Sequence, residues 1–317
     1  MPPIVTELWN AVLVHPLINL LVLAYDAVHD FGLAVVIVTV AIRLALYPLF
    51  RAQVVSSRKM QELAPALTDI KKKYGNDRAR VQQEQMKLYQ ERGINPAAGC
   101  LPMLVFFPVL FAMYAAFQQV GGLSGSHALT VQELRDHVLW PFIPPPPGLG
   151  DGDVIDLTAH WIPWVTSLAH PDHAWFNFIG PLPIISAVLQ LIASVQALPR
   201  NPPQTDDPTQ RTMQSMTYYL PLITVVFFKD LAAGVFIYYI TTTIFQIVQQ
   251  YFVMGWGQLP RWIPALDNIP TPADRVMRER EQAAIKEAEA DMKLADGVGA
   301  QKREANGGRR RGRRRKR

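Results

Sequence analysis

The sequence predicts an all-α polytopic membrane protein with five transmembrane helices, a cytoplasmic two-helix hairpin and an N-terminal interfacial helix. Half of the 317 residues are hydrophobic, only 18% are charged, and the mean hydropathy is positive. The charge is also segregated, because 26 of the 31 Lys and Arg residues lie in residues 51–92 and 258–317. Between these blocks run apolar stretches long enough to cross about 30 Å of hydrocarbon as helices.

Residues 1–28 form the first expected element, an amphipathic helix that lies in the membrane interface. The apolar run at 11–28 contains His15-Pro16, Asn19 and Asp26, and almost no connector separates it from the next run. Polar groups at such intervals favour a helix lying in the interface, although a true span stays open as the alternative. A cleaved signal peptide is not expected, because no Lys or Arg precedes Arg43.

Five apolar runs within residues 29–255 are expected to span the membrane. They lie at about residues 31–50, 101–120, 176–199, 214–228 and 231–254. Arg43 alone interrupts the first run, and Lys229-Asp230 separates the last two as a tight polar turn.

The loops between these runs predict the orientation. Residues 51–92 hold ten basic and five acidic side chains, whereas residues 121–175 hold one basic and six acidic side chains. Cytoplasmic loops carry the excess of Lys and Arg. The sequence therefore predicts that 51–92 and the tail 256–317 are cytoplasmic, that 121–175 is extracytoplasmic, and that the N-terminus is outside.

The cytoplasmic segment 51–92 is predicted to be an antiparallel helical hairpin. Apolar side chains recur with helical spacing from Met60 to Tyr74, and Gly75-Asn76 interrupts the pattern. The hairpin is either a solvated charged element or a docking arm for an acidic partner or anionic lipids. The cations that would serve as such an arm are Lys71, Lys72, Lys73, Arg78 and Arg80.

Arg43 is the most informative residue of the chain. It lies eight residues before Arg51, about 12 Å from the cytoplasmic end of its span. An Arg facing lipid at that depth costs at least about 2.5–3.5 kcal/mol. No Asp or Glu occurs within the five predicted spans, so we expect Arg43 to face a wet cavity; the alternative is a structural ion pair.

Other spans also place polar side chains on one face, which predicts a hydrophilic cavity within the bundle. The candidate groove residues are Thr39, Arg43 and Tyr47 in the first span, Gln118 in the second, Gln190 in the third, and Tyr239, Thr243 and Gln246 in the fifth. Thr39, Arg43 and Tyr47 share a face because they are four residues apart. Small polar side chains also serve as close packing between membrane helices, which stays the alternative for part of this set.

Four ordered segments resemble the YidC/Oxa/Alb family of membrane protein insertases. They are residues 40–48, which include Arg43, residues 93–108, residues 161–172 and residues 234–251. The resemblance covers about residues 20–255 and is to the compact bacterial form, without the large periplasmic domain of some members. Tyr239 stands where many members have Trp, Thr243 where many have Asn, and Phe106 where a Gln is common.

The resemblance implies a five-span core with a groove open to the cytoplasm and to lipid, in which Arg43 attracts acidic residues of an incoming nascent membrane protein. Gln190 matches a Gln that lines the groove in this family. The implied function is insertion and chaperoning in the bacterial cell membrane, with no chemical catalysis, nucleotide, metal or other cofactor. A translating ribosome, the Sec translocon and the signal-recognition machinery are the further partners implied.

The outer loop and the tail complete the predictions. Residues 121–175 hold five His and several Asp, which make a metal site the alternative here, but their Pro and Gly content indicates an irregular loop. The sequence therefore favours an interfacial surface cap that packs Trp140, Trp161 and Trp164 and predicts no metal site. The tail is expected to form an exposed helix and then a disordered end that binds ribosomal RNA or anionic lipids. Its terminal cations are Arg309, Arg310, Arg311, Arg313, Arg314, Arg315, Lys316 and Arg317.

One competing function is a small-anion transporter or channel in which Arg43 binds the solute. Transporters commonly contain internal repeats and helices broken at the midplane. The five spans are unequal, with a 55-residue outer loop between the second and third, and they show no such repeat. The sequence therefore favours the insertase.

Overall fold

The computed structural model describes residues 3–75, 77–95, 101–122, 127–146, 148–173, 179–200, 208–276, 279 and 282. This part of the chain is helical, and its extended pairing is limited to two isolated bridges, Thr130 with Val154 and Pro171 with Ala232. The predicted all-α class is confirmed for the described residues.

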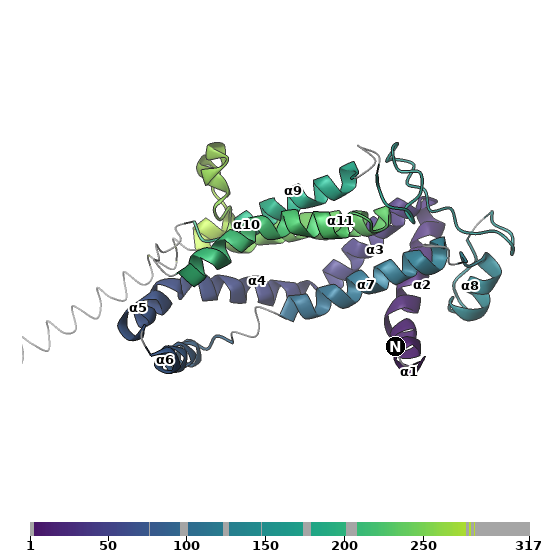
Figure 1. Ribbon diagram of the computed structural model, residues 1–317. Coiled ribbons are helices and arrows are strands. Elements are labelled where there is room, and N and C mark those ends of the chain that lie inside the picture. The colour runs from purple at the N-terminus through teal and green to yellow at the C-terminus, as the bar shows by residue number, and fades with distance from the viewer. Residues whose placement is uncertain are drawn as a thin grey trace, which may run out of the picture.

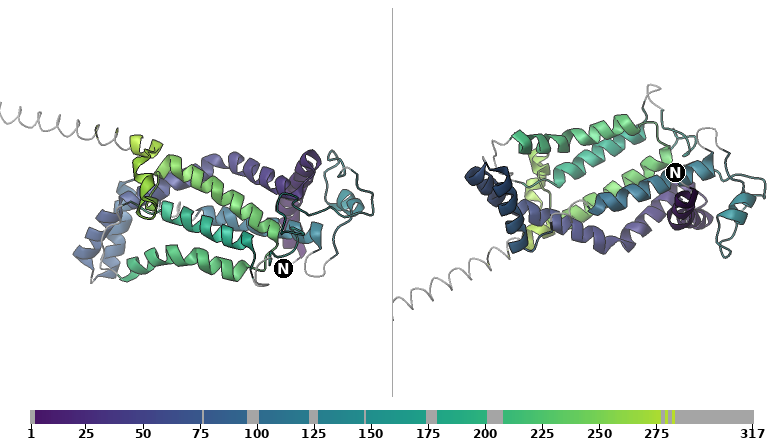
Figure 2. Two further views of the ribbon diagram at one scale, coloured as in Figure 1. Left: turned by 90° about the horizontal axis from the view of Figure 1, so that it is seen from above. Right: turned by 60° about the horizontal axis from the view of Figure 1, so that its bottom comes forward.

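The helices follow one another in a simple order. They are α1 (Pro3–Trp9), η1 (Asn10–Val14), α2 (His15–Val28), α3 (Phe31–Ala45), α4 (Tyr47–Glu62), α5 (Ala64–Tyr74), α6 (Arg78–Glu91), α7 (Leu101–Gly121), α8 (Val131–His137), α9 (Pro181–Gln196), α10 (Pro208–Phe228), α11 (Ala233–Met254), η4 (Leu259–Arg261) and η5 (Pro264–Asn268). Helices α4, α7, α9, α10 and α11 run in roughly the same direction (Figure 1; Figure 2), and α11 packs against both α9 and α3.

The N-terminal helix runs crosswise to this bundle (Figure 1). Helices α1, η1 and α2 are continuous, and the segment Ile4–Val28 is by length and composition able to cross a membrane. Its inner face is buried through Val14, Ile18 and Val22. The interfacial position of this helix stays a prediction.

The first predicted span is not one straight helix, which corrects the expectation for 31–50. The chain bends by 67° between α3 and α4. Pro48 stands at the start of α4 and has no N–H to offer Leu44, and its ring would clash with that carbonyl in a straight helix. The break at Leu46 therefore has a local cause.

The five-span count stays a prediction. In the described residues, Ile4–Val28 alone is a single helix long and apolar enough to span, and the bent pair α3–α4 passes the same criterion when taken together. Pro181–Gln196 and Ser215–Phe228 are apolar but shorter. Residues 174–178, which include the first three residues of the third span predicted at 176–199, lie outside the described part.

The two loops of opposite charge lie at opposite ends of the bundle. Helix α4 continues beyond residue 50, the predicted end of the first span, to Glu62. The hairpin predicted for 51–92 is therefore formed by α5 and α6 only, and Pro65 lies in the first turn of α5. This hairpin is at one end of the bundle, and the loop with α8 is at the other (Figure 1).

The outer loop is folded onto the bundle and the N-terminal helix. Leu134, Ile155 and Leu168 belong to the same hydrophobic core as α2 and α7. The buried Asn19 amide of α2 donates to Val138 O at 2.8 Å, and its Oδ1 accepts from Trp140 N at 2.6 Å. The indole rings of Trp140, Trp161 and Trp164 remain exposed on this loop.

Candidate functional site

Arg43 is buried at the last turn of α3, with 8% of its surface exposed. Its guanidinium carbon lies 4.3 Å from the centroid of the Phe50 ring on α4. Among the residues that the structure describes, no carboxylate lies within ion-pair distance of Arg43. The structural ion pair considered from the sequence is therefore not formed within the described chain.

Arg43 faces a cavity of about 190 Å³ between α3, α4, α9 and α11. The cavity is lined by Arg43, Phe50, Gln53, Val54, Gln190, Tyr239, Thr242, Thr243, Gln246 and Gln249. Seven of these carry an uncharged polar group, and Arg43 supplies the positive charge. The helical spacing of residues 239, 242, 243, 246 and 249 explains why α11 contributes half of the lining.

Some polar groups of this lining bind each other, and one buried amide has no hydrogen-bond partner within the described residues. The Thr243 hydroxyl donates to Tyr239 O at 2.8 Å and lies 3.5 Å from Gln190 Oε1. The Nε2 group of Gln249 is buried without a hydrogen-bond partner in the described residues. A site that combines a desolvated guanidinium with a buried amide donor lacking a partner can hold a carboxylate, because both groups donate charge-assisted hydrogen bonds to an anion.

A second, smaller cavity of about 20 Å³ adjoins the first. Arg43, Phe50 and Thr242 line both cavities and therefore stand between them. Thr39 lines only the small cavity, and its hydroxyl donates to Val35 O at 2.6 Å.

The structure brings six of the eight candidate groove residues to these two cavities and leaves two elsewhere. Tyr47 is 39% exposed and does not line either cavity. The break at Leu46 removes the single helix face on which Thr39, Arg43 and Tyr47 were expected to lie. Gln118 is half-buried three residues before the end of α7, at the outer-loop end of the bundle.

Sequence reasoning missed Gln53, Thr242 and Gln249. Thr242 and Gln249 carry a usable signal, because they lie three and ten residues after Tyr239 and so fall on the same helical face. Gln53 lies on α4, after the bend, so its position in the cavity could not be assigned before the bend was known. Ser186, by contrast, donates to Pro183 O at 2.7 Å within α9 and serves as packing.

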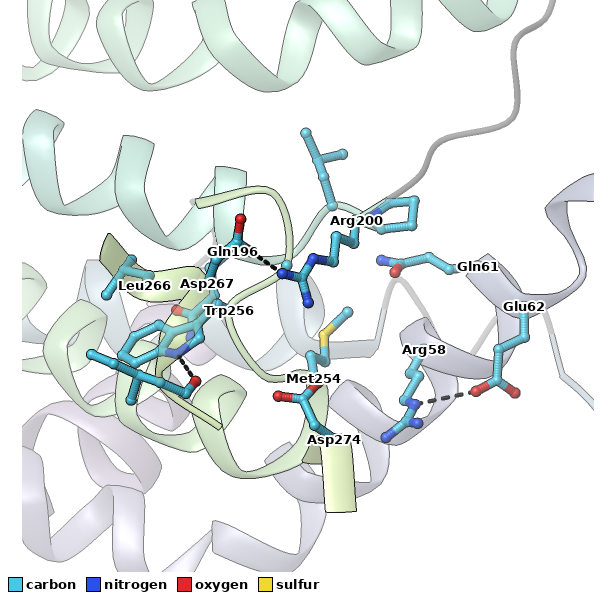
Figure 3. A pocket seen from close by; sticks show the side chains of 14 residues that line it. Arg58, Gln61, Glu62, Gln196, Arg200, Met254, Trp256, Leu266, Asp267 and Asp274 are labelled. Atoms are coloured by element: carbon cyan, nitrogen blue, oxygen red, sulfur yellow. Dashed lines mark hydrogen bonds and ion pairs between the residues drawn. The ribbon is translucent and has the colours of Figure 1, made fainter. Parts of the chain in front are cut away.

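A larger cavity of about 230 Å³ lies where the C-terminal ends of α9 and α11 meet α4 (Figure 3). Arg58 donates to Val253 O at 2.6 Å and pairs with Glu62 at 3.2 Å. Gln61 donates to Ala197 O, and Arg200 pairs with Asp267. These side chains bind carbonyls at the ends of two helices and pair with each other. They therefore connect the helix ends around this cavity.

The candidate docking cations differ in how exposed they are. Lys72, Lys73, Arg78 and Arg80 are exposed on α5 and α6, and Lys71 is half-buried. Lys73 and Arg80 both lie over the ring of Tyr74, at 5.2 and 5.1 Å. The terminal cations Arg309 to Arg317 and the side chain of Phe106 lie outside the described residues.

Histidines of the outer loop pair with carboxylates. His127 lies 3.3 Å from Glu133, His160 lies 3.2 Å from Asp30, and His173 lies 3.2 Å from Asp230. Within the described chain, no three His, Cys, Asp or Glu side chains gather as metal ligands.

The model of the 60Kd inner membrane protein family matches residues 23–258. The chain belongs to this family. Curated relatives include membrane protein insertase YidC of Wigglesworthia glossinidia brevipalpis, 29% identical over 77% of this chain and 37% of the relative, and of Histophilus somni, 31% identical over the same shares. Inner membrane protein ALBINO3 of Arabidopsis thaliana is 28% identical over 73% of this chain and 49% of its own length.

These matches confirm the resemblance to the YidC/Oxa/Alb family and imply a membrane protein. The chain spans about two fifths of the length of the bacterial relatives. A crystal structure of an active YidC insertase is 24% identical, over 77% of this chain and 47% of that one, with a TM-score of 0.48.

Proposed function

We propose that the protein is a membrane protein insertase and chaperone, and that the cavity around Arg43 receives the polar tail of an incoming membrane protein. The observation that carries the proposal is a buried guanidinium that faces amides and hydroxyls, with no carboxylate paired to it in the described chain. Relatives that are named insertases support it.

The physical basis of the proposal is a complementary charge in a poorly solvated site. A carboxylate of the substrate tail is attracted more strongly by a buried guanidinium than by one in water, because the local dielectric constant is lower. The polar lining shortens the path that the tail must cross through hydrocarbon. Burial of the substrate's apolar segment in the bilayer supplies the free energy, so the proposed reaction consumes no nucleotide and needs no cofactor.

The proposal includes the location and the partners. We place the chain in the bacterial cell membrane with five spans, the N-terminus outside and the C-terminus in the cytoplasm. The charge difference between the two ends of the bundle supports this orientation. We assign the exposed cations of α5 and α6 and the basic tail to contacts with translating ribosomes and anionic lipids, beside the Sec translocon and the signal-recognition machinery.

The central test is substitution of Arg43 in the full-length protein in proteoliposomes. Arg43→Ala and Arg43→Glu are expected to abolish insertion of a small membrane protein whose translocated tail contains Asp, whereas Arg43→Lys retains much of it. A substrate with Asn at the same tail positions is the matched control and should depend less on Arg43. Insertion of the acidic substrate by Arg43→Ala at the wild-type rate would contradict the mechanism.

Crosslinking separates the insertase from an anion transporter. Photoreactive residues at positions 43, 190 and 239 should label the membrane segment or tail of a nascent chain stalled on the ribosome. Position 111 on α7, which is exposed and outside the cavity, is the control. No crosslink from any of the three cavity positions, together with anion uptake that requires Arg43, would favour the transporter.

A further inference from the structure

The ring of Phe50 is a neighbour of Arg43 that the proposed function does not explain. Phe50 is buried, and its ring centroid lies 4.3 Å from the guanidinium carbon. A guanidinium at this distance over an aromatic face is attracted by the negative face of the ring. The two residues are seven positions apart but belong to different helices, α3 and α4.

A straight helix would not make this contact. Seven residues advance a helix by about 10 Å, and an Arg side chain leans toward the N-terminus of its helix, away from a residue that follows it. The 67° bend between α3 and α4 turns Phe50 back toward the end of α3. The Pro48 ring, which cannot continue α3, is the local cause of that bend.

We propose that Phe50, placed by the Pro48 bend, is a positioning residue that holds the Arg43 guanidinium in the cavity for a substrate carboxylate; this inference rests on the proposed function. A ring that lies over a guanidinium occupies one of its faces, whereas a carboxylate binds along its N–H edge, so the two contacts are compatible. Arg43 and Phe50 also line both cavities, together with Thr242, so the pair lies at the boundary between the larger and the smaller cavity.

The chemistry of the contact separates positioning from packing. Leu at position 50 would keep most of the buried apolar area but would have no aromatic face. Tyr would keep the face and the ring size. A contact of this kind between partly desolvated groups corresponds to roughly a fivefold to tenfold change in a rate or binding constant.

The experiment compares Phe50→Leu and Phe50→Tyr in full-length protein in proteoliposomes. Two substrates are used, one with Asp in its translocated tail and one with Asn at the same positions. Phe50→Leu is expected to slow insertion of the Asp substrate about fivefold and to leave the Asn substrate near the wild-type rate. Phe50→Tyr restores insertion of the Asp substrate. Phe111→Leu, on the exposed face of α7, leaves both rates unchanged.

Two further variants make the outcomes decisive. Pro48→Ala, which allows a straighter helix, should reproduce the selective defect of Phe50→Leu. Equal loss for both substrates, or equal loss in Phe50→Leu and Phe50→Tyr, assigns Phe50 to packing and overturns the inference. If Arg43→Ala fails on the Asp substrate while Phe50→Leu matches wild type, the inference about Phe50 fails and the proposed function stands. If Arg43→Ala inserts that substrate normally, the proposed function itself fails.

Discussion

The carboxylate of Asp30 accepts a 2.8 Å hydrogen bond from the backbone N–H of His160, 130 residues later in the chain. The same carboxylate caps the start of α3 by accepting from Leu33 N at 2.9 Å. One buried side chain thus fixes the first residues of α3 and attaches the outer loop to them. Since α3 carries Arg43, this contact connects the outer cap to the helix that positions the site.

Replacement of Asp30 should reduce stability in a pH-dependent way. Burial raises the pKa of Asp30, but hydrogen bonds from Leu33, His160 and Trp161 outweigh burial and hold this pKa below 3.8. The stabilisation is therefore complete above pH 3.8 and is lost as the pH falls through the lowered pKa. Asp30→Asn should have a lower Tm at pH 7 and a shallower acid decline than wild type in detergent. Parallel declines in the two proteins would contradict this assignment.

Gly234 should not tolerate a side chain. A Cβ at this position would overlap the ring of Phe117 on α7, where α11 begins against the outer loop. Gly234→Ala is expected to cost about 1–3 kcal/mol of stability through overpacking, measured as a fall in Tm. Phe117→Leu in the same chain should recover part of the loss, because it removes the ring that the new methyl meets. A double mutant whose Tm loss is the sum of the single losses would contradict this explanation.

Asn19 should be essential for attachment of the N-terminal helix. Its side chain binds Val138 O and Trp140 N of the outer loop. Asn19→Ala would leave these buried groups without partners, at about 1–3 kcal/mol. We expect a lower Tm and faster proteolysis of the outer loop in protein reconstituted in nanodiscs. Asn10→Ala, at a half-buried position of the same helix, is the control and should change neither measurement.

Composition, charge and periodicity were sufficient to predict the all-α class of the described residues and several of the residues that line the cavity around Arg43. Arg43 could be assigned to a cavity with a polar lining because burial of a lone cation in hydrocarbon is costly at any position in the fold. Gln190, Tyr239, Thr243 and Gln246 followed because periodicity defines which face of a helix they share. These inferences depend on local geometry and on solvation, both of which the sequence encodes directly.

The remaining parts of the site depend on how helices meet, which a linear pattern does not encode. Pro48 allows both a kink and a helix start, and the break at Leu46 separates Tyr47 from the face of Arg43 while bringing Phe50 and Gln53 toward the site. Periodicity placed Gln118 on the inner side of α7. It could not show that this position along α7 lies at the outer-loop end of the bundle, beyond the cavity. Such positions become assignable only when the packing of α4, α7 and α11 is known.

Gln249 should show a conflict between stability and function. It is 4% exposed, lines the Arg43 cavity, and keeps its Nε2 without a hydrogen-bond partner in the described chain. A buried donor without a partner destabilises the fold unless water or a ligand satisfies it. Gln249→Met, of similar size and flexibility, should therefore keep or raise the Tm in detergent. The same change removes a polar group from the cavity, so insertion of the substrate with Asp in its tail should slow severalfold.

Gln250→Met, buried on the adjacent face of α11 and outside the cavity lining, is the matched variant for the rate measurement. A fall in both Tm and insertion in Gln249→Met would show that its amide stabilises the fold.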